Sequence, residues 1–383
     1  MPIDRRSLLA GLLALAPLPT LAQSPLPWRW PGAPDPTLAA FEGMLALLPA
    51  ALVTPGEAWV DIGFGDPAAA RGMDVAGPDL LTLPRRQALR AMPVMTRASD
   101  LIERNGDWRR AAGFHLDDVQ QLALITRGRD IATLMQLAPG VGARVEQALQ
   151  AGGYDRAEEA GLVALTVGPD GGVSLEARNR DDPFRGPTGR SARVQVEGDL
   201  LRHTNTWPLL ATLAGTDASA LTDPGIAALL AGLAGVQGGP LVSAFLMPDA
   251  ARLGGADPFQ TVTGRATPGG PAGWQGLVFA DFTTGPQSTA VMVATLPWPE
   301  GEPLEPLIQA VRQGWETAAF NRTTLAERHG AVLIEATRAP GGLAWLRMWQ
   351  SAETGTSRTG HARNSLHQDL LLATVTGQLR LLP

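Results

Sequence analysis

The sequence contains neither cysteine nor lysine, and its 31 basic residues are all arginine. Without cysteine the chain offers no disulfide, thiolate nucleophile, cysteine-ligated zinc, iron–sulfur cluster or lipid-anchoring cysteine. Without lysine it offers neither a Schiff-base amine nor the lysine of a phosphate-binding P-loop. These absences remove several classes of enzyme and cofactor site before any motif is considered.

Basic runs and long apolar runs are also scarce. The formal net charge is −6, and 45% of the residues are hydrophobic against 18% charged. This composition supports a sizeable core and differs from that of disordered chains. The acidic balance argues against nucleic acid as a partner. Beyond the N-terminus no apolar stretch is long enough to span a bilayer, so we expect no membrane span in the mature chain.

The first 22 residues have the features of an export signal. Arg5 and Arg6 precede an apolar segment over residues 7–22, which is interrupted by proline and ends in the cleavage-site triplet TLA at Ala22. The arginine pair resembles a twin-arginine signal, and Sec export is the alternative. We therefore predict a periplasmic protein whose signal peptide is removed near Ala22.

A pattern of strand, tight turn, strand, helix and strand occurs twice. The first copy, from Val119 to Val167, contains VQQLALIT, IATLMQLA, the helix VGARVEQALQAGG and GLVALTVG. The second contains GLVFADF, STAVMVATL, the helix PLEPLIQAVRQGW and GAVLIEAT. Three pairs of positions align: Ala148 with Ala310, Gly161 with Gly330, and Asp199 with Asp369. Such self-similarity, with length differences confined to loops, predicts a duplicated domain.

Both repeat helices carry one apolar stripe. In the second copy its members are Leu304, Leu307, Ile308, Val311 and Trp315. We predict that Leu307, Ile308 and Val311 are buried against a sheet, as are Val145 and Leu149 in the first copy. Further strands are expected after each repeat, in VSLEAR, ARVQVEGDLLRHT, LAWLRMW and DLLLATVTGQLRLL, and two Ala/Leu-rich helices over residues 207–236 connect the halves.

The predicted organisation has five parts: a signal peptide (1–22), an N-terminal lead-in and helix (23–56), a first α+β repeat (57–206), a helical connector (207–238) and a second α+β repeat (239–383). The fold class is α+β, a tandem duplication of a ferredoxin-like unit with antiparallel sheets and helices packed on one face. With its DPFRGPTGR loop, the chain resembles uncharacterised exported bacterial proteins with two tandem ferredoxin-like halves. The resemblance implies this fold and no activity.

Motifs for nucleophilic catalysis and phosphate binding are incomplete. The segment GRSAR at Gly189 lacks the second glycine of a G-x-S-x-G elbow. The turn GFGDP at Gly63 lacks the G-x-G-x-x-G spacing, and Asp66 would repel a phosphate. We expect Asp66 instead to cap a helix at the exit of a strand. No catalytic residue is predicted.

The histidines suggest two incomplete metal sets. These are His115 with Asp117 and Asp118, and His361 with His367 and Asp369. Neither has the H-E-x-x-H spacing that places two imidazoles on one helix face. We favour solvated polar residues and predict neither a metal site nor a cofactor.

The segment RDDPFRGPTGR, residues 180–190, is the best candidate for ligand contact. Arg180, Arg185 and Arg190 present planar guanidinium groups near glycines that permit close approach of a carboxylate or other anion. Of these, Arg185 and Arg190 are, together with Asp182, the predicted ligand-binding residues. The alternative is a surface loop in which Asp181 and Asp182 pair with the arginines.

The favoured function is that of a periplasmic, non-enzymatic binding or accessory protein for a small ligand or a periplasmic protein partner. Ligand contact is expected at Arg185, Arg190 and the two loops that differ between the repeats, residues 72–114 and 254–273. Two alternatives stay open: a hydrolase-type enzyme whose site is assembled from distant residues, and a metal-binding accessory protein.

Overall fold

The computed structural model describes residues 37–54, 60–73, 90–91, 108–179, 181–215, 218–250, 274–320, 322–356 and 362–375. All of these lie in the larger of two compact units of the chain, Pro34–Pro383. The predicted signal peptide, most of the insertion between Gly72 and Phe114, Arg180, the loop 251–273 and His361 lie outside the described residues.

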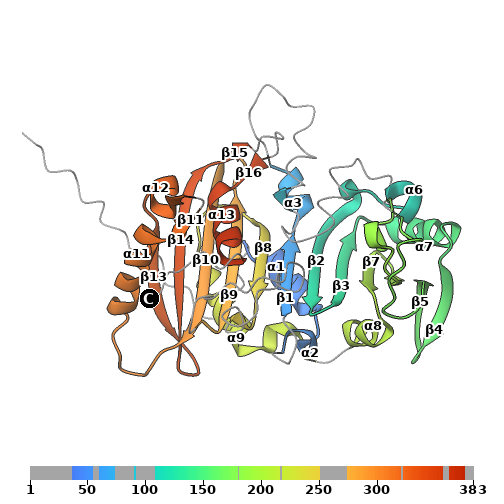
Figure 1. The fold of residues 1–383 in the computed structure, drawn as a ribbon, viewed down its shortest axis with the longest axis horizontal. Coiled ribbons are helices and arrows are strands. Elements are labelled where there is room, and N and C mark those ends of the chain that lie inside the picture. Colours follow the sequence, from blue (N-terminus) through green and yellow to red (C-terminus); the bar gives the residue numbers. More distant parts are fainter. Residues whose placement is uncertain are drawn as a thin grey trace, which may run out of the picture. The chain divides into compact units, whose positions relative to one another are not determined.

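Strands form the centre of the described part of the chain (Figure 1). They are β1 (Val60–Gly65), β2 (Val119–Arg127), β3 (Asp130–Leu137), β4 (Asp155–Glu159), β5 (Leu162–Val167), β6 (Ala192–Glu197), β7 (Leu200–Thr204), β8 (Leu241–Met247), β9 (Gly276–Thr283), β10 (Gln287–Pro297), β13 (Leu333–Ala339) and β14 (Leu343–Glu353). These twelve make one sheet in the order β13-β14-β10-β9-β8-β1-β2-β3-β7-β6-β5-β4. Two short pairs stand apart: β11 (Ala319–Phe320) with β12 (Thr323–Thr324), and β15 (Gly355–Thr356) with β16 (Ala362–Arg363).

Helices cover the sheet and connect its strands. They are α1 (Ala39–Ala46), α2 (Ala50–Val53), α3 (Pro67–Arg71), α6 (Trp108–Ala112), α7 (Val141–Ala151), α8 (Trp207–Ala214), α9 (Pro224–Leu233), α11 (Glu305–Thr317), α12 (Leu325–His329) and α13 (Ser365–Val375). Side chains that precede a first-turn proline cap several of them. Asp66 Oδ1 accepts from Ala69 N at 2.7 Å, and Asp223 Oδ1 from Ile226 N at 2.9 Å. No helix in the described ranges is long and apolar enough to cross a membrane.

The two halves of the chain meet between β1 and β8. Strand β1 pairs antiparallel with β2 on one side and with β8 on the other, where Phe64 faces Ala244. The sheet is therefore continuous across the predicted boundary between repeats. The expectation of a separate sheet in each half was wrong, because the first strand of each half pairs with the other.

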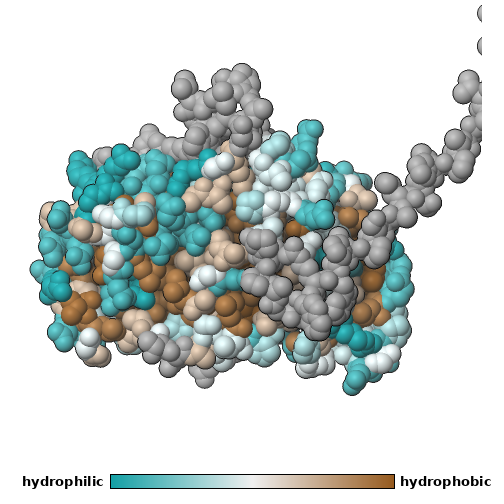
Figure 2. Space-filling model, turned by 180° about the vertical axis from the view of Figure 1, so that it is seen from behind, coloured by the Kyte–Doolittle hydropathy of each residue, from teal (hydrophilic) through white to brown (hydrophobic). Residues whose placement is uncertain are grey.

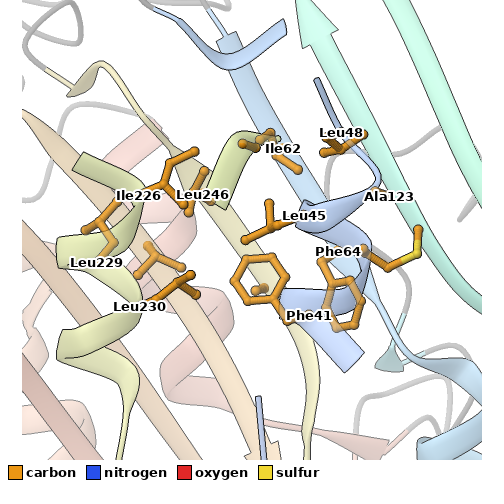
Figure 3. Packing of buried hydrophobic residues seen from close by; sticks show 14 of the residues in the cluster. Phe41, Leu45, Leu48, Ile62, Phe64, Ala123, Ile226, Leu229, Leu230 and Leu246 are labelled. Atoms are coloured by element: carbon orange, nitrogen blue, oxygen red, sulfur yellow. The ribbon is translucent and has the colours of Figure 1, made fainter. Parts of the chain in front are cut away.

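Strand periodicity divides the core between the two faces of the sheet. On β9, Val278 and Ala280 join a cluster with helices α1 and α9, whereas Leu277 and Phe279 join one with α11 and α13. Figure 3 shows side chains of α1 and α9 pointing toward one another above the strands. Helices thus cover both faces, which differs from the predicted one-sided packing.

Figure 2 shows the face of the molecule on which α1 and α9 cover the sheet, and hydrophobic residues there lie between hydrophilic areas. Beneath its surface the ring centroids of Phe41 on α1 and Phe64 on β1 are 5.0 Å apart. This contact places α1 directly over the strand that joins the halves, so the N-terminal helix completes the shared core.

Most elements of the two predicted repeats are confirmed. Both contain the hairpin, the helix and the following strand, as β2-β3-α7-β5 and β9-β10-α11-β13, and α8 and α9 form the predicted connector helices. Val145, Leu149, Leu307 and Val311 are buried as predicted, whereas Ile308 is half-buried. Strand β4 was not predicted.

Two predicted strands are wrong. DLLLATV forms part of helix α13, because the buried Leu366, Leu370 and Ala373 recur at helical spacing along one face. VSLEAR is irregular, with Val173 and Leu175 more than 60% exposed and a single bridge from Val173 to Arg190. Alternation of apolar residues does not make a strand where no core receives them.

The ferredoxin-like arrangement is not confirmed. In the first half, β1, β2 and β3 lie side by side in sequence order, whereas a split β-α-β unit places another strand between the two that it connects. What the structure supports is an α+β fold built on a large antiparallel sheet.

Candidate functional site

The predicted ligand-binding loop lies at the C-terminal end of α7, in the first half. It enters through Asp182, makes a tight turn at Gly186–Thr188 and leaves through Gly189, whose φ of 61° is in the left-handed region. A Cβ at Gly189 would lie 1.9 Å from Ser174 O, so only glycine fits this close approach. The glycines that suggested ligand access therefore serve the path of the loop.

Asp182 is buried inside the loop and accepts three hydrogen bonds. Tyr154 Oη donates to Oδ2 at 2.8 Å, and the backbone N–H groups of Phe184 and Arg185 donate to Oδ1 at 2.8 and 3.2 Å. Burial raises the pKa of Asp182 and, with the adjacent Asp182, that of Tyr154. Asp182 thus fixes the loop to the end of α7.

The two predicted arginines are brought together by the backbone. Arg190 N donates to Arg185 O at 3.1 Å, and both residues are half-buried. The Arg185 guanidinium donates to Ala177 O within the same loop region. Asp181, which the alternative paired with these arginines, contacts Arg110 at 3.5 Å instead. Nothing in this geometry tests ligand contact by Arg185 and Arg190, which stays a prediction.

A buried histidine under the loop was not recognised as special from the sequence. His203, on β7, lies 4.9 Å from the ring centroid of Phe184, and its Nδ1 is 3.3 Å from Thr133 Oγ1. Burial, together with the charges of Arg190 and Arg193, lowers the pKa of His203 to about 3. The imidazole is therefore neutral at physiological pH, as a core histidine is expected to be.

A groove opens beside α7 on the same face of the sheet. It has a volume of about 350 Å³ and is lined by Glu146 of α7, Arg156 of β4, Val163, Ala164 and Leu165 of β5, and Val194, Gln195, Val196 and Glu197 of β6. None of Asp182, Arg185 and Arg190 lines it. Its residues are dispersed in sequence, so only the pairing of β4, β5 and β6 under α7 could have revealed it.

Register explains the apolar floor of the groove. Leu165 faces Val194 across β5 and β6, and Val163 and Val196 occupy the next positions on the same face. Val194 is in turn directly opposite His203 on the next strand, β7. The groove floor is thus continuous with the core that carries the buried histidine.

The rim of the groove is charged. Glu197 accepts from Arg202 Nη1 at 2.9 Å, and Glu146 on α7 and Arg156 on the edge strand β4 also line the groove. An apolar floor with a few charged groups at its border can hold an apolar group and orient a polar end.

Residues of the two histidine sets, for which no metal site was predicted, make contacts within the chain, and Asp369 is buried rather than solvated. His115 caps the turn Leu116–Asp118, where its Nδ1 accepts from Asp117 N at 3.2 Å and Asp118 Oδ2 accepts from His115 N at 2.8 Å. Asp369 contacts His329 Nε2 at 2.9 Å and Arg328 Nε at 2.8 Å. Within the described ranges no three histidine or carboxylate side chains converge as metal ligands would.

No protein-family model and no curated protein match the chain. It is similar to solved structures of TP0453: crystal form III (TM-score 0.37, 8% identity, 79% of this chain and 94% of that chain), crystal form IV (0.38, 8%, 88% and 99%) and crystal form I (0.35, 7%, 90% and 99%). At these TM-scores the likeness carries no functional conclusion.

Proposed function

We propose that this chain is a non-enzymatic binding protein of the periplasm and that the groove beside α7 receives its ligand or partner. The supporting observation is an open depression of about 350 Å³ floored by aliphatic side chains of adjacent strands. Ligand sites are typically concave, roughly 300–1,000 Å³ in volume and mostly apolar. The groove is at the small end of this range and its exposed lining is more polar than that of a typical site, so it suits one apolar group of a larger, partly polar ligand.

The charged rim narrows the class of ligand. Glu146 and Glu197 are acidic and Arg156 is basic, so the border carries both signs. We infer a ligand with an apolar body and a polar or charged end, either a small molecule or a short segment of a protein. The location in the periplasm rests on Arg5, Arg6 and the apolar segment that follows them.

Arg185 and Arg190 remain the proposed contact for an anionic partner. They belong to the same half as the groove and are half-buried next to glycines. Asp182 keeps them in place through its contacts with the loop backbone. The groove and the arginine loop are separate surfaces, so their contributions can be tested independently.

One group of buried residues bears on the alternative that the protein is a hydrolase. Ser288, Asp281 and His367 are buried near one another in the second half. However, Arg90 Nη2 donates to both Ser288 Oγ and Asp281 Oδ1, so the carboxylate is paired with a cation and the serine oxygen faces a proton donor where a nucleophile would face a base. Binding is therefore the better-supported function.

We also propose that the two halves arose by duplication of a ferredoxin-like unit. Around the central pair β1–β8, the sheet continues as β2-β3-β7 on one side and β9-β10-β14 on the other. In each half a hairpin leads into a helix and then a strand. This internal correspondence supports the duplication.

The experiment compares variants by native mass spectrometry of protein purified from the periplasm. Val163→Asp/Val196→Asp places charges in the groove floor, and Arg185→Ala/Arg190→Ala removes the loop cations. Val173→Asp, at a 62% exposed valine of the same half, is the matched control. We expect the groove variant to lose the co-purifying molecule, with circular dichroism showing that it and the control are both folded at the temperature of purification; some loss of melting temperature is expected in the groove variant because Val196 packs against the core.

Three other outcomes are decisive. Retention of a verified ligand by the groove variant overturns the groove as the site. Loss only in the arginine variant moves the site to the loop. Turnover of the co-purified molecule by the pure protein favours the enzyme alternative.

A further inference from the structure

A fully buried arginine joins the insertion of the first half to the second half. The side chains of Arg90 and Asp281 are each 2% exposed. Nε and Nη2 of Arg90 donate to the two carboxylate oxygens of Asp281 at 2.6 and 2.7 Å. This is the two-pronged geometry by which guanidinium and carboxylate groups recognise one another.

Hydroxyl groups complete the pocket around the guanidinium. Nη2 also donates to Ser288 Oγ at 2.8 Å, and Nη1 is 3.2 Å from Thr283 Oγ1 and 3.5 Å from Thr354 Oγ1. A planar group with five N–H donors thus meets a carboxylate and three hydroxyls. A lysine ammonium, a compact point charge, could not reach the same acceptors together.

The acceptors are held in place without Arg90. Asn364 Nδ2 donates to Asp281 Oδ1 at 2.8 Å, Ser288 Oγ lies 2.6 Å from Thr354 Oγ1, and Gly285 N donates to Thr283 Oγ1 at 2.9 Å. All of these groups belong to the second half: they come from β9, β10 and the turn between them, the residue after β14 and the residue before α13. The pocket is therefore built by one half, and its occupant comes from the other.

The backbone that delivers Arg90 is fitted tightly to the sheet. A Cβ at Gly65, the last residue of β1, would lie 1.8 Å from Ala91 O. Ala91 itself is buried with Ala70 and Val242. Only glycine at position 65 leaves room for the backbone of Ala91, and this position of Ala91 allows the neighbouring Arg90 to reach Asp281.

We propose that this second-half pocket is a recognition site for a guanidinium group, which Arg90 occupies in cis. An alkylguanidinium compound, or an arginine side chain of another protein, binds there when Arg90 is removed or displaced. The ligand class follows from the acceptors: one carboxylate for the charge, three hydroxyls for the remaining N–H groups, and burial that strengthens each contact.

The test is rescue of Arg90→Ala by ethylguanidinium at millimolar concentration. The melting temperature of this variant should rise by several degrees, whereas wild type, whose pocket is filled, should not respond. Urea, a neutral molecule of the same shape, and ethylammonium at equal ionic strength should have no effect. Arg90→Ala/Asp281→Asn should show no rescue, because the carboxylate is lost.

Further measurements test whether the guanidinium group can come from an arginine residue, and they cover the case in which Arg90→Ala does not fold. Acetyl-arginine-amide compared with acetyl-lysine-amide tests an arginine residue as ligand. Gly65→Ala keeps Arg90 in the chain but moves Ala91, and it should gain sensitivity to ethylguanidinium. If Arg90→Ala does not fold unaided, its refolding yield from urea with and without ethylguanidinium replaces the melting temperature. Equal rescue in the double variant, or no rescue of Arg90→Ala by either readout, overturns the proposal.

Discussion

The guanidinium group of Arg347 stacks on Trp349, with 4.8 Å between its Cζ atom and the ring centroid. Trp345 lies on the other side at 5.5 Å, because the three residues occupy alternate positions of β14 and face the same way. Nη1 of Arg347 donates to the carbonyl groups of Gly232 and Ala234 at 3.1 and 2.9 Å. A single cation therefore ties the C-terminal end of α9 to the sheet.

Loss of this arginine should destabilise the fold. Arg347 is buried and also contacts Glu335, and Arg347→Ala removes all of these bonds while leaving carbonyl groups of α9 unpaired. We expect a loss of about 2–4 kcal/mol in the free energy of unfolding, measured from urea denaturation. Arg347→Lys should lose less, because the charge stays and only the planar fork is lost. Arg312→Ala, an exposed arginine of α11, should stay within about 0.5 kcal/mol.

The apolar stripe of α11 gives a second stability prediction. Leu307 is 4% exposed and packs with the core shared by α11 and α13, so Leu307→Ala should cost about 2–5 kcal/mol. Leu372, on α13, is 49% exposed and is the matched control, for which a change within about 0.5 kcal/mol is expected. Equal midpoints for the two variants would contradict the burial of Leu307.

The pattern of apolar residues along the sequence predicted most of the helices and strands. It could not predict which strands pair with one another in the sheet. The stripe on α11 and the apolar runs of β9 and β10 depend on neighbours in sequence, and both were predicted. The β1–β8 contact joins residues separated by the whole first half, and nothing in either strand specifies its neighbour. Predicting α13 as a strand followed from aligning Asp369 with Asp199, although its apolar residues recur at helical spacing.

The candidate sites divide in the same way: one is formed by residues adjacent in sequence, and the others form only when distant segments meet. The loop 182–190 was found because its arginines and glycines are adjacent in sequence. The groove was missed because Glu146, Leu165 and Val194 meet only after β5 and β6 pair beneath α7. The Arg90 pocket was missed because its carboxylate, Asp281, lies in the other half, where its sequence neighbours are apolar.

Export is the third prediction. The apolar segment after Arg5 and Arg6 should direct the chain to the periplasm, with cleavage near Ala22. N-terminal sequencing of the periplasmic fraction checks the cleavage position, and full-length protein confined to the cytoplasm would contradict it. Replacement of both arginines by lysine should block export by the twin-arginine route and leave Sec export largely unaffected.

The last prediction concerns the pH dependence of stability through His203. Its pKa is about 3 in the folded protein, lowered by burial and by Arg190 and Arg193, against about 6.5 in an unfolded chain. Well above pH 6.5 neither state is protonated and His203 contributes no pH dependence. As the pH falls from 6.5 towards 3, only the unfolded state takes up a proton, so stability falls.

Between pH 7 and pH 5 this uptake amounts to about 2 kcal/mol of lost stability. Asp182 acts in the opposite direction, since its raised pKa lets the folded state take up a proton first, and His367, whose pKa is lowered by burial, acts in the same direction as His203. Both groups are retained in His203→Gln, so the difference between wild type and variant isolates His203. Urea denaturation at the two pH values should show a smaller pH dependence for the variant. Equal pH dependence would show that the imidazole accepts its proton without unfolding.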